Sequence, residues 1–404
     1  DARVTLSRDA FKLVSRYEQN NALVLFVPEN ANNYRLSLVT IEPKLDSEGI
    51  KVKREYSNPK RYSYVLGVDS KTHTPEQYLI KKGRIANLVD LKSRFSVEVV
   101  NKDFYNLIAE MFSKLVGGRR KKGTRNIDFK RQLYLPSVSS ENDKKYKEFA
   151  VRLIGRIMFC WFLTKKKSES NLPLIPEEVL SKDAVDVNHG FYHSRVEPLF
   201  FEVLNTPIEK RKSRYRVKPF DSIPFLNGGL FEPHPDDYYE ISNLTETSTY
   251  VNTLKIPDDW WKEFLGFLEI YNFTIDENTS IDIDLSVDPE MLGRIFENLL
   301  AEINPETGKT ARKSTGSYYT PRPVVEYMVD SSLKHYFEVK TKIESKKISY
   351  LLDNSVEDSG LTPDEEQQVE SALFNLRILD PACGSGAFPM GILQKILMIL
   401  QKVD

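Results

Sequence analysis

Asp380, Gly384 and Gly386 are the residues whose types and spacing most clearly suit chemistry. They lie in the stretch "RILDPACGSGAF", near the C-terminal end of the sequence. Glycines let a ligand approach the backbone because they have no Cβ atom, and the start of a following helix offers unpaired N–H groups. The pattern therefore predicts a turn that holds a ligand between a strand and a helix.

Several kinds of turn would fit this pattern. A phosphate-binding loop needs a lysine directly after its last glycine, but Ala387 follows Gly386. A dinucleotide-binding turn has a third glycine, at the position where this chain has Pro389. An S-adenosylmethionine site remains, in which Asp380 would meet the cationic methionine amine or nearby groups. A structural turn without any ligand stays open, because short glycine patterns are common.

The elements around this turn are expected to position it. Residues 377–379 predict a short buried strand, and apolar residues at helical spacing over 392–400 predict a helix. Two helix starts precede them, at Thr320-Pro321 and at Thr362-Pro363, the second with a capping-box glutamate. Helix, strand and helix in this order indicate the beginning of a parallel α/β sheet.

The rest of the chain predicts an α+β multidomain protein. Residues 1–92, with β-rich runs at 23–27 and 34–41, predict a small N-terminal α/β domain. Residues 93–312 predict a mainly helical domain, and its first helix should end at Gly117-Gly118 and be followed by a basic loop over 119–131. Residues 313–404 form the third predicted part.

The composition limits the class of protein. The 404 residues are too many for one ordinary domain, and the formal net charge of −1 excludes a uniformly basic surface but not local basic patches. The two cysteines and five histidines have no metal-binding spacing, so we expect no metal site in this chain. No apolar run reaches membrane-spanning length and no signal peptide is evident, so we expect a cytoplasmic protein without a membrane partner.

Several stretches, taken together, resemble a known family. "LDPACGSGAF" looks like the cofactor motif of adenine-N6 DNA methyltransferases, and "TGSYYTPRPVVEYMV" resembles the segment before that motif in the gamma class. "DPEMLGRIFENLL", "IPFLNGGLFEP" and "RFSVEVVNKDFY" are similar to stretches of large type IIG or IIS-like restriction–modification enzymes, which combine nuclease, methyltransferase and target recognition in one chain. The resemblance covers about residues 94–404 and is only loose before them.

The resemblance implies an S-adenosyl-L-methionine site within a Rossmann-like class I methyltransferase fold that begins in residues 313–404. An aromatic ring of the first segment can pack on the sulfonium, although ordinary packing at a helix entry stays an alternative. The implied cofactor contacts are Tyr318, Tyr319, Thr320 and Pro321 from the first segment, and Asp380, Pro381, Ala382, Gly384 and Gly386 from the motif.

The resemblance also implies what the chemistry needs besides the cofactor. The adenine must flip out of the duplex, and the family holds it with an Asn- or Asp-Pro-Pro-Tyr or -Phe segment. This chain contains no Pro-Pro dipeptide and no next strand with an acid for the cofactor ribose. We therefore expect no catalytic residue in this chain, which we interpret as the N-terminal part of a larger enzyme that is inactive alone.

A nuclease centre is a weaker hypothesis. Restriction nucleases of this group commonly hold a divalent metal with an acid followed by Glu-x-Lys. Glu42-Pro43-Lys44 has this form, with Glu29 as the nearest upstream acid, but the central proline argues against it. Mg²⁺ is therefore expected only for a nuclease part that we do not identify in this sequence.

Two basic stretches are candidate contacts to double-stranded DNA. Such clusters bind phosphates without reading the base sequence, but a solvated loop is the alternative. The candidates are Arg119, Arg120, Lys121, Lys122 and Arg125 in the first stretch, and Arg214 and Arg216 in the second. Two other functions stay open: a non-catalytic DNA-binding or anti-phage scaffold module, and a nucleotide-dependent enzyme. The sequence indicates no oligomeric state.

Overall fold

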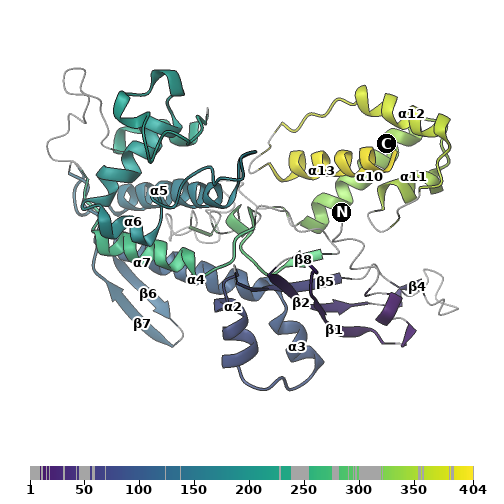
Figure 1. The fold of residues 1–404 in the computed structure, drawn as a ribbon, viewed down its shortest axis with the longest axis horizontal. Coiled ribbons are helices and arrows are strands. Elements are labelled where there is room, and N and C mark those ends of the chain that lie inside the picture. Colours follow the sequence, from purple (N-terminus) through teal and green to yellow (C-terminus); the bar gives the residue numbers. More distant parts are fainter. Residues whose placement is uncertain are drawn as a thin grey trace. The chain divides into compact units, whose positions relative to one another are not determined.

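Figure 1 shows the chain as a computed structural model. The structure describes residues 10–44 except 11, 15, 18, 31 and 42; residues 55 and 56; residues 60–237 except 69, 123, 137, 227 and 228; residues 254–274; residues 282–299 except 290, 294, 296 and 297; residue 320; and residues 322–403 except 354, 355, 357, 358, 382, 384 and 385. The chain divides into two compact units. The smaller unit comprises residues 1–12, 41–59 and 312–404, and the larger unit comprises residues 13–40 and 60–311.

The larger unit contains a four-stranded sheet in the order β1-β2-β5-β8. Its first three strands are antiparallel neighbours, and β8 lies parallel to β5. Because side chains alternate across a strand, Leu38 and Tyr64 face the core, whereas the Ser37 and Ser63 hydroxyls bond on the other face at 2.8 Å. The strands are β1 (Asn21–Phe26), β2 (Asn33–Thr40), β5 (Lys60–Gly67) and β8 (Asp282–Asp284).

Helices make up most of the larger unit, as the sequence predicts for its middle part. They are α2 (His73–Pro75), η1 (Glu76–Lys81), α3 (Leu88–Arg94), α4 (Val97–Val116), α5 (Asp143–Lys165), α6 (Lys182–Val187), η2 (Tyr192–Val196), η3 (Pro198–Leu204), η4 (Ile208–Lys210), η5 (Ser213–Tyr215), η6 (Gly229–Phe231), η7 (Pro235–Asp237) and α7 (Asp258–Glu269). Sheet and helices share one core, because Leu38 and Tyr64 belong to the same buried cluster as the apolar residues of α4, α5 and α7.

The helix α4 forms as its periodicity predicts. Phe104, Ile108, Met111 and Leu115 are buried at spacings of three and four residues. Gly117 ends the helix with a φ of 79°, a left-handed conformation that favours glycine, and its N–H donates to the Ser113 carbonyl at 2.8 Å.

The basic loop that we expected over residues 119–131 is instead a β-hairpin. Its strands are β6 (Gly118–Lys122) and β7 (Arg125–Phe129), paired antiparallel from Gly118 and Phe129 to Lys122 and Arg125. The alternation of polar and apolar residues in "RNIDF" and the Gly-Thr dipeptide before it are sequence signals of a hairpin. The sequence interpretation used only the positive charge of this stretch. Figure 1 shows the hairpin continuing from the end of α4.

A buried arginine organises the chain between η1 and α3. Arg94 uses all five of its N–H donors, which go to the carbonyls of Tyr78, Gly83 and Arg84 and to both oxygens of Asp90. The donor–acceptor distances lie between 2.7 and 3.1 Å. Only 2% of the Arg94 side chain is exposed, so these bonds replace the water that the charge loses on burial.

A second buried arginine connects α5 with the segment from Gly229 to Asp237. Arg156 donates to the carboxylate of Asp237 at 2.8 Å and to the carbonyls of Leu230 and Glu232 at 2.7 and 2.8 Å. Phe231 is buried beside Phe159 and Phe200. Phe231, which the sequence stretch "FLNGGLFEP" contains, therefore packs inside the larger unit.

In its described residues, the smaller unit contains the helices α10 (Arg322–Lys340), α11 (Ser345–Leu352), α12 (Pro363–Phe374) and α13 (Ala387–Val403). A short strand pair, β3 (Pro43–Lys44) and β4 (Glu55–Tyr56), belongs to the same unit. Val325, Val329, Leu333 and Phe337 follow one face of α10 into a core shared with Ile399 of α13. The predicted capping box at the start of α12 is present in full, with Thr362 accepting from the Glu365 N–H.

The mixed α/β character that the sequence predicts is confirmed, but the prediction of a buried strand at residues 377–379 is wrong. These residues form no strand, and Ile378 and Leu379 are 49% and 87% exposed. A strand needs a hydrogen-bonding partner strand, and among the described residues none pairs with this segment. A Rossmann-like C-terminal part therefore stays a prediction. The three-part division also stays a prediction: its boundary at 312 lies beside the unit boundary, and its boundary at 92 lies inside the larger unit.

Candidate cofactor turn and candidate nucleic-acid interface

The glycine turn lies directly before α13, where the sequence predicts it. Gly386 has a φ of 84°, and its N–H donates to the Cys383 carbonyl at 2.7 Å. The N–H of Met390 then donates to the Gly386 carbonyl at 2.9 Å and begins the helix. A Cβ atom at Gly386 would meet none of the described atoms within 4 Å, so the described surroundings leave the backbone of this residue open to approach.

The described residues around the turn are Asp380, Pro381 and Cys383. Asp380 is half-buried, whereas Pro381 and the Cys383 thiol are exposed. The other candidates in the motif, Ala382 and Gly384, lie outside the described residues.

The second candidate segment leads into α10. Thr320 is half-buried, whereas Tyr318, Tyr319 and Pro321 lie outside the described residues. Arg322, two residues after Thr320, donates to the side chain of Gln394 on α13 at 3.3 Å. Eight residues separate Gln394 from Gly386, which corresponds to about 12 Å of helix. The start of α10 is therefore fixed on the same helix that the glycine turn opens.

The packing of α10 on α13 depends on a glycine. A Cβ atom at Gly391 would lie 2.6 Å from Cγ1 of Val325, so only a residue without a side chain allows this approach. Farther along, the Lys395 ammonium lies 2.8 Å from the Asp330 carboxylate and donates to the Leu352 carbonyl at 3.0 Å. Steric fit and an ion pair between the buried Lys395 and the half-buried Asp330 together hold the two helices.

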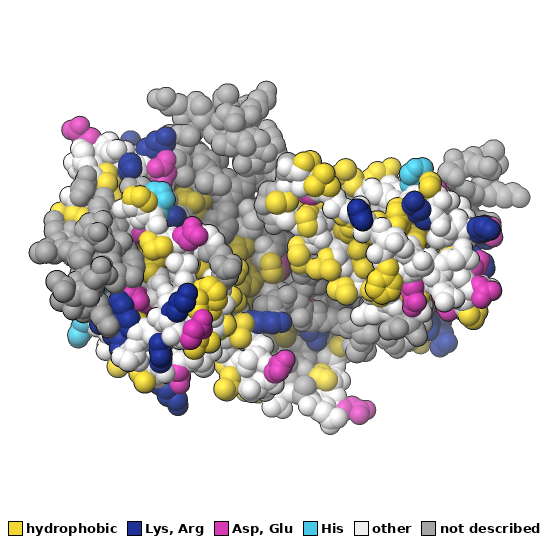
Figure 2. All heavy atoms as spheres, turned by 90° about the horizontal axis from the view of Figure 1, so that it is seen from above, with side chains coloured by type: hydrophobic (Ala, Val, Ile, Leu, Met, Phe, Trp, Pro, Cys, Tyr) yellow, Lys and Arg dark blue, Asp and Glu magenta, His cyan; other side chains and the backbone are white. Residues whose placement is uncertain are grey.

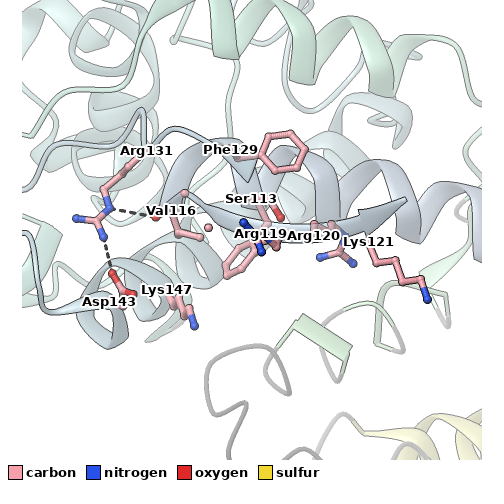
Figure 3. Close-up of a pocket in the computed structure, with 12 residues that line it drawn as sticks. Ser113, Val116, Arg119, Arg120, Lys121, Phe129, Arg131, Asp143 and Lys147 are labelled. Atoms are coloured by element: carbon pink, nitrogen blue, oxygen red, sulfur yellow. Dashed lines mark hydrogen bonds and ion pairs between the residues drawn. The ribbon is translucent and has the colours of Figure 1, made fainter. Parts of the chain in front are cut away.

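A pocket of about 660 Å³ lies between the hairpin and the ends of α4 and α5, and we name it the hairpin pocket (Figure 3). Its lining is strongly basic. The lining residues are Phe112, Ser113, Val116, Gly117, Gly118, Arg119, Arg120, Lys121, Phe129, Arg131, Asp143 and Lys147. Our sequence interpretation included Arg119, Arg120 and Lys121 but missed Lys147 and Phe112, which come from two different helices.

The cations of the hairpin pocket differ in their contacts. Arg119 pairs with Asp128 across the hairpin at 2.7 Å. The guanidinium of Arg120 lies 6.0 Å from the ring centre of Tyr105. Lys121 is exposed and Lys147 is half-buried, and neither forms an ion pair with a residue that the structure describes.

Arg131 clamps one side of the hairpin pocket. It donates to the carbonyls of Val116 and Ser140 at 3.0 and 2.8 Å and to the carboxylate of Asp143. Its guanidinium also lies 4.0 Å from the ring centre of Tyr146. Figure 3 shows Arg131 reaching Val116 and Asp143, so it connects the end of α4 with the start of α5.

The other predicted DNA contacts are less closely grouped. Arg125 is exposed on β7, and the side chain of Lys122 is outside the description. Arg216 donates to the carbonyls of Arg211 and Glu209, both at 2.6 Å, which is a structural role in this segment. Arg214 lies 5.0 Å from the ring centre of Tyr215. The structure does not bring Arg214 or Arg216 into the hairpin pocket.

The residues of the nuclease hypothesis give little support to a metal centre. Pro43 and Lys44 form β3, Glu29 is exposed in a turn, and Glu42 lies outside the described residues. Among the side chains that the structure describes, no three His, Cys, Asp or Glu residues are grouped to hold a metal ion.

Comparisons with known proteins find few similarities. Residues 139–286 match the model of a domain of unknown function (DUF7814). The chain is 31% identical, over 283 residues, to a protein of Methanocaldococcus jannaschii named "Putative type II restriction enzyme and methyltransferase". The aligned part is 66% of this chain but only 22% of that relative, so the chain spans about a fifth of its length. No solved structure matches. No helix in the described ranges has the length and apolarity to cross a bilayer.

Proposed function

We propose that this chain is part of a type II restriction–modification enzyme. The enzyme transfers a methyl group from S-adenosyl-L-methionine to adenine N6 in a specific site of double-stranded DNA and cleaves unmodified DNA. One observation carries the proposal: an open glycine turn heads α13 in a chain similar to a protein whose name states both activities.

The residues at the turn suit the cofactor. S-adenosylmethionine supplies the methyl group when it is bound, and Asp380 would hold its cationic methionine amine or nearby groups. The open space beside Gly386 lets the cofactor approach the backbone, and Pro381, Ala382 and Gly384 are further proposed contacts. The segment from Tyr318 to Pro321 would close over the methionine part, since Arg322 ties the start of α10 to α13.

The exposed apolar surface of the smaller unit supports a Rossmann-like setting (Figure 2). Ile378 and Leu379 are exposed in the extended segment, and Leu393 and Leu397 are about half exposed on α13. In a doubly wound fold, strands pair with one another and helices bury such faces against the sheet. We therefore propose that further parts of a methyltransferase domain cover these exposed apolar residues.

Methyl transfer is the direct test. The full-length protein that contains this chain is incubated with S-adenosylmethionine and duplex DNA, and N6-methyladenine is measured by mass spectrometry. We expect product from the wild type and at least a hundredfold less from Asp380→Ala, which corresponds to the loss of about 2.7 kcal/mol. DNA binding without any methyl transfer would favour the scaffold module instead.

The two cysteines provide a binding test that does not need activity. Cys383 is exposed inside the turn, whereas Cys160 is buried and burial raises the pKa of its thiol, so only Cys383 should react with iodoacetamide. We expect S-adenosylmethionine to slow the labelling of Cys383, followed by peptide mass, and ATP to leave it unchanged. Protection by ATP alone would contradict the proposal and favour a nucleotide-dependent enzyme.

A further inference from the structure

We propose that the hairpin pocket binds the backbone phosphates of duplex DNA, with Lys121 and Lys147 as the principal contacts. The inference rests on the proposed function, since it takes DNA as the substrate, and it assigns the contact to one place on the larger unit. The inference also gives different roles to the basic residues at positions 119–122, which the sequence alone does not distinguish.

The hairpin pocket carries a net positive charge. Five of its lining residues are cations and one, Asp143, is a carboxylate. Asp143 is engaged by Arg131, so its charge is already balanced within the clamp. Arg119 is likewise balanced by Asp128. Three cations of the lining remain: Arg120, whose guanidinium lies 6.0 Å from the ring centre of Tyr105, and Lys121 and Lys147, which come from different elements and form no ion pair with a described residue. Together these three give the pocket its net positive charge.

The elements that carry the pocket are connected to one another. The hairpin follows α4 through Gly117, whose φ of 79° sets the direction of β6, and Arg131 ties the end of α4 to the start of α5. Lys121 on β6 and Lys147 on α5 are therefore carried by elements that are fixed to each other. A preformed arrangement of cations loses less entropy when it binds an anion.

The size and lining of the pocket favour a polyanion over a single small ion. A volume of about 660 Å³ lies within the range of sites that take nucleotide-sized ligands. Among the described residues of the lining there is no Asn or Gln, the residue types that read adenine in the major groove. Contacts from lysines to phosphates position DNA but do not specify its sequence. The hairpin pocket is therefore a positioning contact, and we expect it to serve all DNA sequences equally.

Salt dependence tests this assignment. Binding of the chain to a fluorescent duplex is measured by anisotropy between about 50 and 200 mM salt for the wild type, Lys121→Ala, Lys147→Ala and the double variant. Each lost phosphate contact should lower the slope of log affinity against log salt by about 0.9 and weaken binding about tenfold at the lowest salt. Duplexes of different sequence should be affected alike.

Lys92→Ala is the matched control, because it removes one exposed lysine from α3 in the same unit and should leave the slope unchanged. Circular dichroism verifies that each variant is folded. An unchanged slope in the double variant, or no DNA binding by the wild type, would overturn the inference. Displacement of DNA by inorganic phosphate at matched ionic strength would also overturn it, because the pocket would then be a small-anion site.

The outcome is separable from that of the proposed function. If the lysine variants alter the salt slope but the full-length protein transfers no methyl group, the phosphate contact is supported and the methyltransferase proposal is contradicted. If the full-length protein transfers methyl groups but the lysine variants leave the slope unaltered, the methyltransferase proposal is supported and the phosphate contact is contradicted.

Discussion

At the scale of single residues, His193 is held in a geometry that favours its protonated form. Its Nδ1 lies 2.9 Å from a carboxylate oxygen of Glu197, and its Nε2 lies 2.8 Å from the Leu254 carbonyl oxygen. Both oxygens accept, so only the doubly protonated ring donates to both. Burial lowers the pKa of His193, but the Glu197 carboxylate and the Leu254 carbonyl outweigh burial and raise this pKa above its usual value.

This geometry predicts a pH-dependent contribution to stability. Because the pKa of His193 is raised in the folded state, its stabilisation is fully present below the unfolded pKa of about 6.5 and is lost as pH rises through the folded pKa. His193→Gln should therefore lower the free energy of unfolding more at about pH 5.5 than at about pH 9. Urea unfolding at both pH values measures this difference.

His189→Gln is the control for this prediction, because His189 is exposed four residues earlier in the chain. It should change the free energy of unfolding little at either pH, because it removes an exposed side chain with no described contact. An equal loss of stability at both pH values in His193→Gln would show that the ring acts only by packing.

The buried pair of Arg156 and Asp237 predicts a larger effect. Their side chains are 4% and 2% exposed. Asp237 also pairs with Arg152 at 3.1 Å, whereas Arg156 pairs with no other carboxylate among the described residues, so removing Asp237 leaves the Arg156 charge buried without compensation. Asp237→Asn should therefore lower the free energy of unfolding by about 3–5 kcal/mol in urea denaturation. The double variant Arg156→Met/Asp237→Asn should lose less than the sum of the two single variants. Additive losses would contradict a direct interaction.

At the scale of elements, the crossing of α10 and α13 depends on Gly391. An alanine there would gain about 1 kcal/mol in helix propensity. Its Cβ atom would stand 2.6 Å from Val325, whose branched side chain is buried and has little freedom to move. Overpacking of this kind costs about 1–3 kcal/mol, so strain should exceed the gain.

Gly391→Ala should therefore destabilise the smaller unit, and Val325→Ala in the same chain should restore part of the loss by making room for the new methyl group. Denaturation followed by circular dichroism measures both effects. Gly266→Ala in α7 is the matched control: its Cβ atom would meet only the flexible Lys182 side chain, at 3.3 Å, so a neutral or stabilising change is expected. Equal losses in both glycine variants would contradict the role of the crossing.

The elements also show what could be predicted from the sequence. Helices depend on local spacing and caps, so α4 and the capping box at Thr362 were predictable. The position of the glycine turn before α13 was also predictable, because it depends on the local sequence. A strand depends on a partner from elsewhere in the chain, so residues 377–379 were wrongly assigned. Lys147 of the hairpin pocket was missed because it joins the basic run only through tertiary packing.

At the scale of the whole molecule, the two compact units offer separate optical signals. All three tryptophans, Trp161, Trp260 and Trp261, are buried in the larger unit, whereas both units contain helices. Units with their own cores can unfold as independent transitions. Gly391→Ala should therefore shift the unfolding transition seen by circular dichroism and leave that seen by tryptophan fluorescence in place. Coincident shifts of both signals would show that the units unfold together.

The five bonds of Arg94 determine where this chain accepts engineering. An insertion of a tag or flexible linker between Gly83 and Arg84 would displace two of the carbonyl oxygens that the guanidinium needs. A lysine could not compensate, because it has only three donors. The residues of the loop from Lys82 to Asn87 are exposed, but the loop cannot change its length without losing these bonds. A fusion is therefore better placed at another site.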